Sequence, residues 1–340
     1  MTNETAAQPV RYDYATCALS YFGAGSGGCG NPLPPGITAG TAYSVPFNIV
    51  LHDGSTRQYL LYIPSNYSPT TPAPLVIAYH GNGDTGLVIQ GDSGWATNAA
   101  NPNYIAVFPY GVGGSWQGAP YSTAGIDDIA FTRFLLANLT STYCVDPTRV
   151  FAAGHSNGGG FVGTMACDPI GSRMFAAYAA NSGAFYPMNL GYTSCNPSTV
   201  YQPCAPYVSR RLPFLEIHGN ADPLINYTGG AHNGECMATV QQYVAQWVVR
   251  DGFATNTTSN TIFAGATQTN VSGGTLGTAI QYQFGTSGQG IYGNPGGVFG
   301  EVEHYQVPGG GHQWQKIATT GFSTSVAMMN FFSQWTLFTG

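Results

Sequence analysis

The sequence predicts an α/β protein with a mainly parallel central sheet and helices on both of its faces. Short continuous apolar runs, typical of strands buried on both faces, lie at 74–79, 104–108 and 150–154. Apolar residues recur at helical spacing in three longer segments, at 127–141, 237–250 and 323–335. Strands that alternate with helices along the chain form a parallel sheet that is covered on both sides.

The remaining elements follow from the same patterns. Further strands are expected at 44–51, 58–63, 175–180, 213–217 and 301–307. Asp53-Gly54 is a turn signal between the first two strands. Asp127 and Asp128 favour a helix start, because acidic side chains stabilise a helix N-terminus. Residues 252–300 are rich in Gly, Thr, Ser and Asn and predict hairpins late in the chain.

A serine lies between the strand at 150–154 and a helix-compatible stretch, in Gly154-His155-Ser156-Asn157-Gly158. This G-x-S-x-G pattern is the nucleophile elbow, a tight turn that exposes the serine oxygen at the top of the sheet. Glycines are needed beside it because the turn leaves no room for side chains. A Gly-rich loop with a surface serine is the alternative, and the flanking strand and helix argue against it. The elbow narrows the prediction to the α/β-hydrolase fold.

A serine becomes a nucleophile when a histidine accepts its proton and a carboxylate orients that histidine. In α/β-hydrolases the chain order is serine, acid, histidine. Asp222 follows the strand at 213–217 and is the candidate acid, although an Asp before Pro223 is also typical of a turn. His312 lies in a Gly loop after the strand at 301–307 and is the candidate base. A solvated loop histidine is the alternative for that position.

Two further pairs of residues are candidates for the site. The loop after the strand at 74–79 and the residue after the nucleophile supply the oxyanion N–H groups in this fold, which points to Asn82 and Asn157. Trp116 and Trp314 are candidates for contacting an aromatic substrate, although aromatic residues more often pack in the core.

Composition restricts the ligands. Only 7% of the residues are charged and the net charge is −6, which argues against nucleic acid. No apolar run approaches the ~18 residues of a membrane span. The cysteines and histidines lack metal-ligand spacing, so no metal or cofactor is expected. We expect a monomer that binds a neutral substrate.

Cysteines and glycosylation sequons favour a secreted, already processed chain. The N-terminus lacks the basic and apolar regions of a signal peptide. Six N-x-S/T sequons and seven cysteines nevertheless favour an oxidising compartment. We expect disulfides Cys144–Cys167 and Cys195–Cys204, with one cysteine left unpaired. Residues 1–340 are expected to form one catalytic domain, with 1–43 as a surface extension and no separate binding module.

Several segments together resemble the secreted fungal feruloyl esterases of the carbohydrate esterase family 1 type, which are related to bacterial polyhydroxybutyrate depolymerases. The matching segments are 79–83, 115–121, 127–131, 143–147, 154–161 and 309–314. The resemblance covers roughly residues 25–340 and implies a metal-free α/β-hydrolase that cleaves hydroxycinnamate esters of plant cell-wall polysaccharide. It also implies that Ser156, Asp222 and His312 are the triad. His155 and Gln315 depart from the family, where Lys and Pro are common.

Alternative functions remain open at this point. The same triad would serve an acetyl xylan esterase or a polyhydroxyalkanoate depolymerase, since the sequence does not give the depth of the acyl pocket. A non-catalytic, hydrolase-like carbohydrate-binding protein is a different class, and the complete set of triad candidates argues against it. A peptidase is less favoured because no feature of the sequence indicates a peptide-binding edge.

Overall fold

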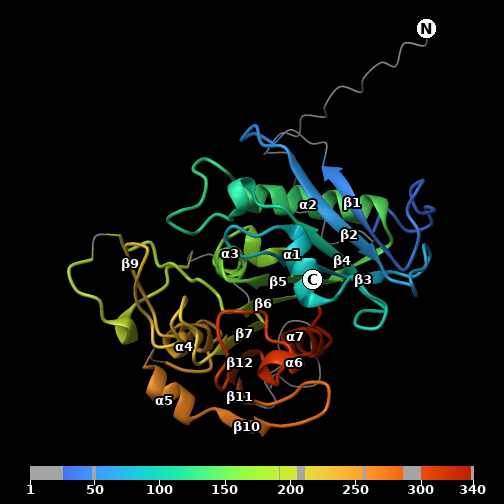
Figure 1. The fold of residues 1–340 in the computed structure, drawn as a ribbon. Coiled ribbons are helices and arrows are strands. Elements are labelled where there is room, and N and C mark those ends of the chain that lie inside the picture. Colours follow the sequence, from blue (N-terminus) through green and yellow to red (C-terminus); the bar gives the residue numbers. More distant parts are fainter. Residues whose placement is uncertain are drawn as a thin grey trace.

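The computed structural model describes residues 26–47, 51–190, 192–204, 211–255, 258–285 and 300–337. Its centre is a parallel sheet formed by β3 (Ala73–Tyr79), β4 (Ile105–Pro109), β5 (Val145–His155), β6 (Ala177–Asn181), β7 (Phe214–Gly219) and β12 (Val302–Val307). Antiparallel strands extend the edges, namely β1 (Thr41–Phe47) and β2 (Arg57–Ile63) on one side and β11 (Ala279–Phe284) and β10 (Thr267–Val271) on the other. The order is β1-β2-β4-β3-β5-β6-β7-β12-β11-β10 (Figure 1).

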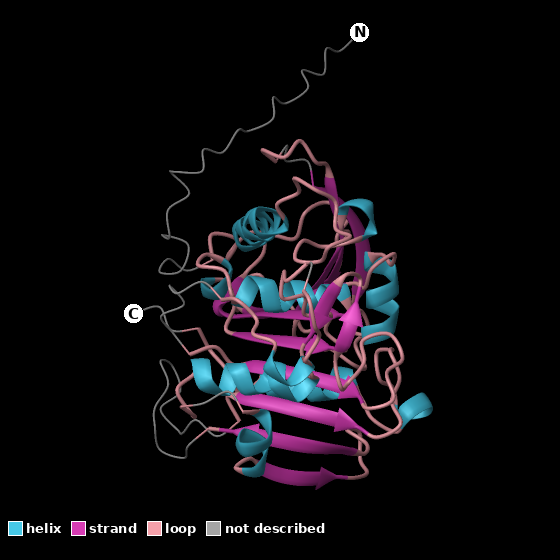
Figure 2. Cartoon of the chain, turned by 90° about the vertical axis from the view of Figure 1, so that its left-hand side faces the viewer, coloured by secondary structure: helices cyan, strands magenta, loops and turns pink. Residues whose placement is uncertain are grey.

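Helices cover both faces of this sheet (Figure 2). The first face packs against α2 (Asp128–Thr142), α3 (Asn157–Ala166), α4 (Val240–Arg250) and α5 (Ser259–Ala264). The second face packs against α1 (Gly86–Ser93) and α7 (Thr324–Phe332), and the short α6 (Ile317–Thr320) precedes α7. None of the helices in the described ranges combines the length and apolar character of a bilayer span.

Strand β3 shows why the apolar run at 74–79 predicted a doubly buried strand. Leu75 and Ile77 belong to the core on the first face, whereas Val76 belongs to the core on the second. Successive side chains of a strand point to opposite faces, so a strand between two helical layers must be apolar at every position. The mainly parallel α/β prediction is confirmed, and the predicted strands are found with ends shifted by at most five residues. Residues 48–50 of the strand expected at 44–51 lie outside the described residues.

The helix predictions need three corrections. The helix expected from 237 begins at Val240, because Thr239 caps it and Glu235–Met237 form strand β9, paired with β8 (Gly230–His232). Helices α1 and α5 were not expected; they are short, and glycine and polar residues weaken their apolar pattern. The β10–β11 hairpin lies in the segment where hairpins were expected, and residues 286–299 of that segment lie outside the described residues.

The expected disulfides were wrong. The described cysteines form the pairs Cys29–Cys144, Cys167–Cys204 and Cys195–Cys236. Ser26 explains the first pair, because its hydroxyl lies within hydrogen-bonding distance of both the Thr140 and Tyr143 carbonyl oxygens and holds the N-terminal segment beside the end of α2. Cys17, the cysteine left over, lies outside the described residues.

Candidate active site

Ser156 occupies a strained turn between β5 and α3. Its φ of 54° and ψ of −118° lie in a region that residues with side chains rarely adopt and that costs about 1–3 kcal/mol. A Cβ added at Gly154 would lie 2.2 Å from the Gly158 carbonyl oxygen, and one at Gly158 would lie 2.2 Å from the Tyr79 carbonyl oxygen. Both glycines of the elbow are therefore sterically required, which is the geometry expected from the pattern.

The three candidate residues Ser156, His312 and Asp222 form one hydrogen-bonded chain. His312 Nε2 lies 2.8 Å from Ser156 Oγ, and His312 Nδ1 lies 2.7 Å from Asp222 Oδ2. They follow β5, β12 and β7, respectively, whose carboxyl ends meet at the same edge of the parallel sheet. Residues far apart in the sequence are thereby brought within hydrogen-bonding distance of one another.

Both carboxylate oxygens of Asp222 accept hydrogen bonds. Its Oδ1 accepts from the amides of Leu224 and Ile225, and the residue is only 4% exposed. Burial alone would raise the pKa of Asp222, but contacts with His218 and His312 outweigh it and hold that pKa well below its usual range. Because an ionised carboxylate only accepts, His312 carries its proton on Nδ1, and Nε2 is free to accept from Ser156.

Backbone contacts fix the loop that carries His312. The Gly310 carbonyl accepts from the Ala221 amide at 3.0 Å, and Gly309 donates to Asn220 Oδ1 at 2.7 Å. On the other side of His312, Asn181 at the end of β6 donates to the Gln313 carbonyl at 3.0 Å. The loop is therefore tied both to the segment before Asp222 and to the strand next to the elbow.

The loop after β3 lies directly against Ser156. A Cβ added at Gly81 would lie 3.4 Å from Ser156 Cβ. His80 holds this loop, since its Nδ1 pairs with the Gly81 carbonyl and its Nε2 accepts from the Gly111 amide at 3.0 Å. Burial lowers the pKa of His80 to about 4, so the ring is neutral. Asn82 follows Gly81, and its side chain is exposed.

Asn157 begins helix α3, and both polar atoms of its side chain form hydrogen bonds with the backbone of Trp116. Its Oδ1 accepts from the Trp116 amide at 2.7 Å and its Nδ2 donates to the Trp116 carbonyl at 3.2 Å. The backbone N–H groups of the first helical turn have no partners within the helix. The Asn157 amide is therefore available beside Ser156, while its side chain fastens the neighbouring loop.

The substrate contact expected of Trp116 is not what the structure shows. The side chain is 0% exposed, its ring stacks on Phe161, and its Nε1 donates to the His80 carbonyl. A ring without exposed surface cannot stack on a ligand. Trp116 instead packs behind the site and links the loop after β3 to Asn157.

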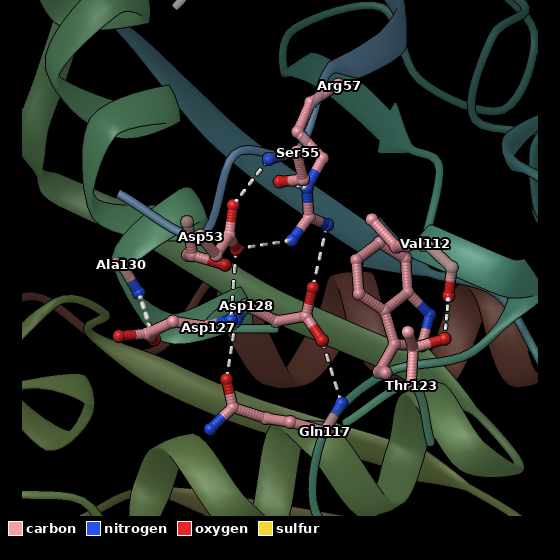
Figure 3. A network of polar contacts seen from close by, with 12 residues as sticks. Asp53, Ser55, Arg57, Val112, Gln117, Thr123, Asp127, Asp128 and Ala130 are labelled. Carbon is pink, nitrogen blue, oxygen red and sulfur yellow. Dashed lines mark hydrogen bonds and ion pairs between the residues drawn. The ribbon is translucent and has the colours of Figure 1, made fainter. Parts of the chain in front are cut away.

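A buried polar network holds the loop of Trp116 in place (Figure 3). Asp128 Oδ2 accepts from the Gln117 amide at 2.8 Å, and Asp128 Oδ1 accepts from Arg57 at 2.7 Å. The Gln117 side chain in turn accepts from the Ile129 amide at 3.0 Å, which satisfies a free N–H at the start of α2.

Trp314 is also a packing residue rather than the expected substrate contact. It is 2% exposed, its Nε1 donates to Ser325 Oγ, and its ring packs edge-on against Trp95. Trp314 thereby links the segment after His312 to α7 and to the core on the second face of the sheet.

The sequence predictions missed an aromatic group near Asp222. Tyr121 packs edge-on against Tyr186, and the Tyr186 hydroxyl pairs with His232 Nδ1 at 2.8 Å. Tyr186 shares a core cluster with Ile225, whose amide binds Asp222. Burial lowers the pKa of His232, His312 lowers it further, and Asp222 opposes the shift. Only Tyr121, within one of the matching segments, carried a signal in the sequence.

Solved structures and known relatives define the class of protein. The described chain is similar to an acetyl xylan esterase from Aspergillus awamori, with a TM-score of 0.58, 17% identity and coverage of 86% of this chain and 99% of that chain. This likeness confirms the predicted α/β-hydrolase fold. No protein-family model matches the chain.

The relatives show the family. A probable feruloyl esterase C from Aspergillus niger is 30% identical over 225 residues, covering 64% of this chain and 69% of the relative. Feruloyl esterase B from Piromyces equi is 31% identical over 178 residues, covering 51% of this chain and 31% of the relative. The chain thus spans about a third of one curated relative and about two thirds of the other. It belongs to the feruloyl esterase family of carboxylic ester hydrolases.

Proposed function

We propose that this protein is a secreted serine esterase that hydrolyses hydroxycinnamate esters, such as ferulate esters, of plant cell-wall polysaccharide. The observation that carries the proposal is the chain of hydrogen bonds from Ser156 through His312 to Asp222, set on a strained elbow. Membership of the feruloyl esterase family supports the choice of substrate.

In the acylation step, Ser156 Oγ attacks the ester carbonyl carbon while His312 Nε2 accepts the hydroxyl proton. The carbonyl π electrons move to its oxygen, and the tetrahedral intermediate then collapses with cleavage of the bond to the alcohol oxygen. His312 returns the proton to the departing polysaccharide hydroxyl. Asp222 stabilises the imidazolium that exists between these two transfers.

Water completes the cycle. His312 accepts a proton from a water molecule that attacks the Ser156 acyl ester, and the free acid leaves as the proton returns to Oγ. The backbone N–H groups of Asn157 and Asn82 are the proposed donors to the oxyanion in both steps. They lie on the two segments that border Ser156, namely the start of α3 and the loop after Gly81.

The aromatic group of Tyr121, Tyr186 and His232 supports a preference for aromatic acids. The half-buried rings of Tyr121 and His232 are suited to contact a flat phenolic acyl group, whereas the buried Tyr186 packs against both and supports them. An acetyl or hydroxyalkanoate acyl group would use the same triad but would make much less contact with these rings. Those substrates remain the alternatives, and a binding protein without catalysis is a further one.

We also propose that the protein acts outside the cell as a monomer. Three disulfides among the described cysteines suit an oxidising compartment. The sequon residues Asn66, Asn226 and Asn270 are exposed, which permits glycosylation.

A direct test compares methyl ferulate, an acetyl ester and a hydroxybutyrate oligomer as substrates of the purified protein. We expect the highest kcat/KM on methyl ferulate. Ser156→Ala should lose activity by at least about 10³-fold while folding normally. The matched control is Ser333→Ala, which alters an exposed serine at the end of α7 and should keep full activity. Activity of Ser156→Ala above a tenth of wild type would end the assignment.

A further inference from the structure

Behind Asp222 the core holds a second set of polar side chains. His218 Nε2 lies 3.2 Å from Asp222 Oδ2, and His218 Nδ1 lies 2.8 Å from Glu216 Oε1. His304 Nδ1 lies 2.8 Å from the other Glu216 oxygen. Glu216, His218 and His304 are 0% exposed. A series of close polar contacts therefore continues from Asp222 into the interior.

The neighbours of His218 determine its protonation. Its Nε2 also contacts the Ile225 carbonyl oxygen at 2.8 Å. A carbonyl and an ionised carboxylate can only accept, so Nε2 must carry a proton. Its Nδ1 faces Glu216, and a second proton there makes the ring an imidazolium between two carboxylates. Burial of the ionised Glu216 carboxylate beside a neutral ring would cost far more free energy than burial of the ion pair.

His304 has a different role, because one of its nitrogens faces a donor. Its Nε2 lies 2.8 Å from the Tyr227 hydroxyl, and its Nδ1 faces the Glu216 carboxylate and carbonyl. A neutral ring with the proton on Nδ1 satisfies both contacts, with the tyrosine donating to Nε2. Glu216, His218 and Asp222 place one cation between two anions.

We infer that Glu216 and His218 form a buried ion pair that positions Asp222 and sets the lower pH limit of catalysis. This inference rests on the proposed function, since it assigns to Asp222 the role of orienting His312. His218 and Glu216 touch no reacting atom and are positioning residues. The His218 imidazolium lies 3.2 Å from Asp222, and its charge disfavours addition of a proton to the His312–Asp222 pair.

The groups around His218 favour a positively charged imidazole ring. The titratable groups that face it are Glu216, Asp222, Tyr227, His155 and, across Glu216, His304. Burial opposes the charged ring, but Glu216 and Asp222 outweigh it and raise the pKa of His218 to about 10. Burial lowers the pKa of His155 to about 3, so that ring adds no charge near neutral pH.

The test is the pH dependence of kcat/KM on methyl ferulate for His218→Gln and for Glu216→Gln/His218→Gln. The double variant removes both charges and leaves no carboxylate stranded in the core. In both variants the acid limb should move to higher pH by about one unit, because the cation that opposes protonation is gone. At the optimum, kcat should fall about tenfold or more with KM little changed, as for a loss of positioning.

Tyr227→Phe is the matched control. It removes a buried hydroxyl at the far end of the network and alters none of the three charges, so its acid limb should coincide with that of wild type. Ring-¹⁵N histidine NMR of the wild-type protein supplies a second readout that does not depend on the variants folding. His218 should remain doubly protonated from about pH 5 to about pH 8.

A neutral His218 at pH 7, or acid limbs that coincide in wild type and both folded charge variants, would overturn the inference. Failure of the proposed function would give a different result from failure of this inference. In that case the wild-type protein itself would hydrolyse none of the three esters, whereas the NMR signature of His218 could still be present.

Discussion

The clearance at Gly154 makes the elbow a sensitive point for substitution. An alanine Cβ there would lie 2.2 Å from the Gly158 oxygen and 2.6 Å from the Gly159 nitrogen, whereas ordinary contacts begin at 3.4 Å. Relief of the first contact requires a shift of about 1.2 Å in the start of α3. The atoms that must move are backbone atoms of the turn that carries Ser156, so no flexible side chain can absorb the change.

We therefore predict that Gly154→Ala lowers kcat by about 100-fold, because a displacement of about 1 Å in a catalytic group costs that much. Overpacking should also reduce the free energy of unfolding by about 1–3 kcal/mol. The assays are steady-state hydrolysis of methyl ferulate and urea denaturation. Gly91→Ala is the matched control, because Gly91 lies in helix α1 with nothing within 4 Å of an added Cβ. It should keep full activity and gain up to about 1 kcal/mol.

A Gly154→Ala variant with more than half of the wild-type kcat would refute this reasoning. It would mean that the turn relaxes without moving Ser156, and that the close contacts at the elbow do not position the nucleophile.

Three further predictions follow from the packing, the cysteines and the buried ion pair. Because the Trp116 ring is buried, Trp116→Ala should lower the free energy of unfolding by about 3–5 kcal/mol. It should also reduce kcat/KM on methyl ferulate and on nitrophenyl acetate by the same factor. A loss of activity confined to methyl ferulate would instead make Trp116 a substrate contact. Thiol titration of the denatured, unreduced protein should find about one free thiol, because three pairs use six of the seven cysteines; three or more would contradict the pairing. The raised pKa of His218, about 10, implies a stabilising contribution that is complete below about pH 6.5 and is lost as pH rises toward 10. Between these pH values the unfolding free energy should fall less steeply in His218→Gln than in wild type, by up to about 1.4 kcal/mol per pH unit. Equal pH dependence in the two proteins would exclude a charged His218.

The features that the sequence predicted well depend on local geometry. The elbow at Ser156 is recognisable because Gly154 and Gly158 are needed for steric reasons that act within five residues. Asp222 and His312 could be placed because each follows a buried strand, and parallel strands end at one edge of the sheet. Strand β3 was predicted because burial on both faces requires an unbroken apolar run.

The features that were missed depend on contacts between distant segments. The Cys29–Cys144 pair forms because Ser26 anchors the N-terminal segment at the end of α2, and cysteine spacing does not encode that approach. Trp116 occupies a loop at the correct edge of the sheet, but its contact with Phe161 turns the ring inward. The link between His218 and Asp222 depends on the path of the chain after β7.

The central claim is that Ser156 carries the acyl group, and mass spectrometry of the rapidly quenched reaction with methyl ferulate tests it most directly. We predict a feruloyl adduct on the peptide that contains Ser156, formed by wild type and absent from Ser156→Ala. Hydrolysis without any adduct on that peptide, or with an adduct on a different residue, would contradict the account.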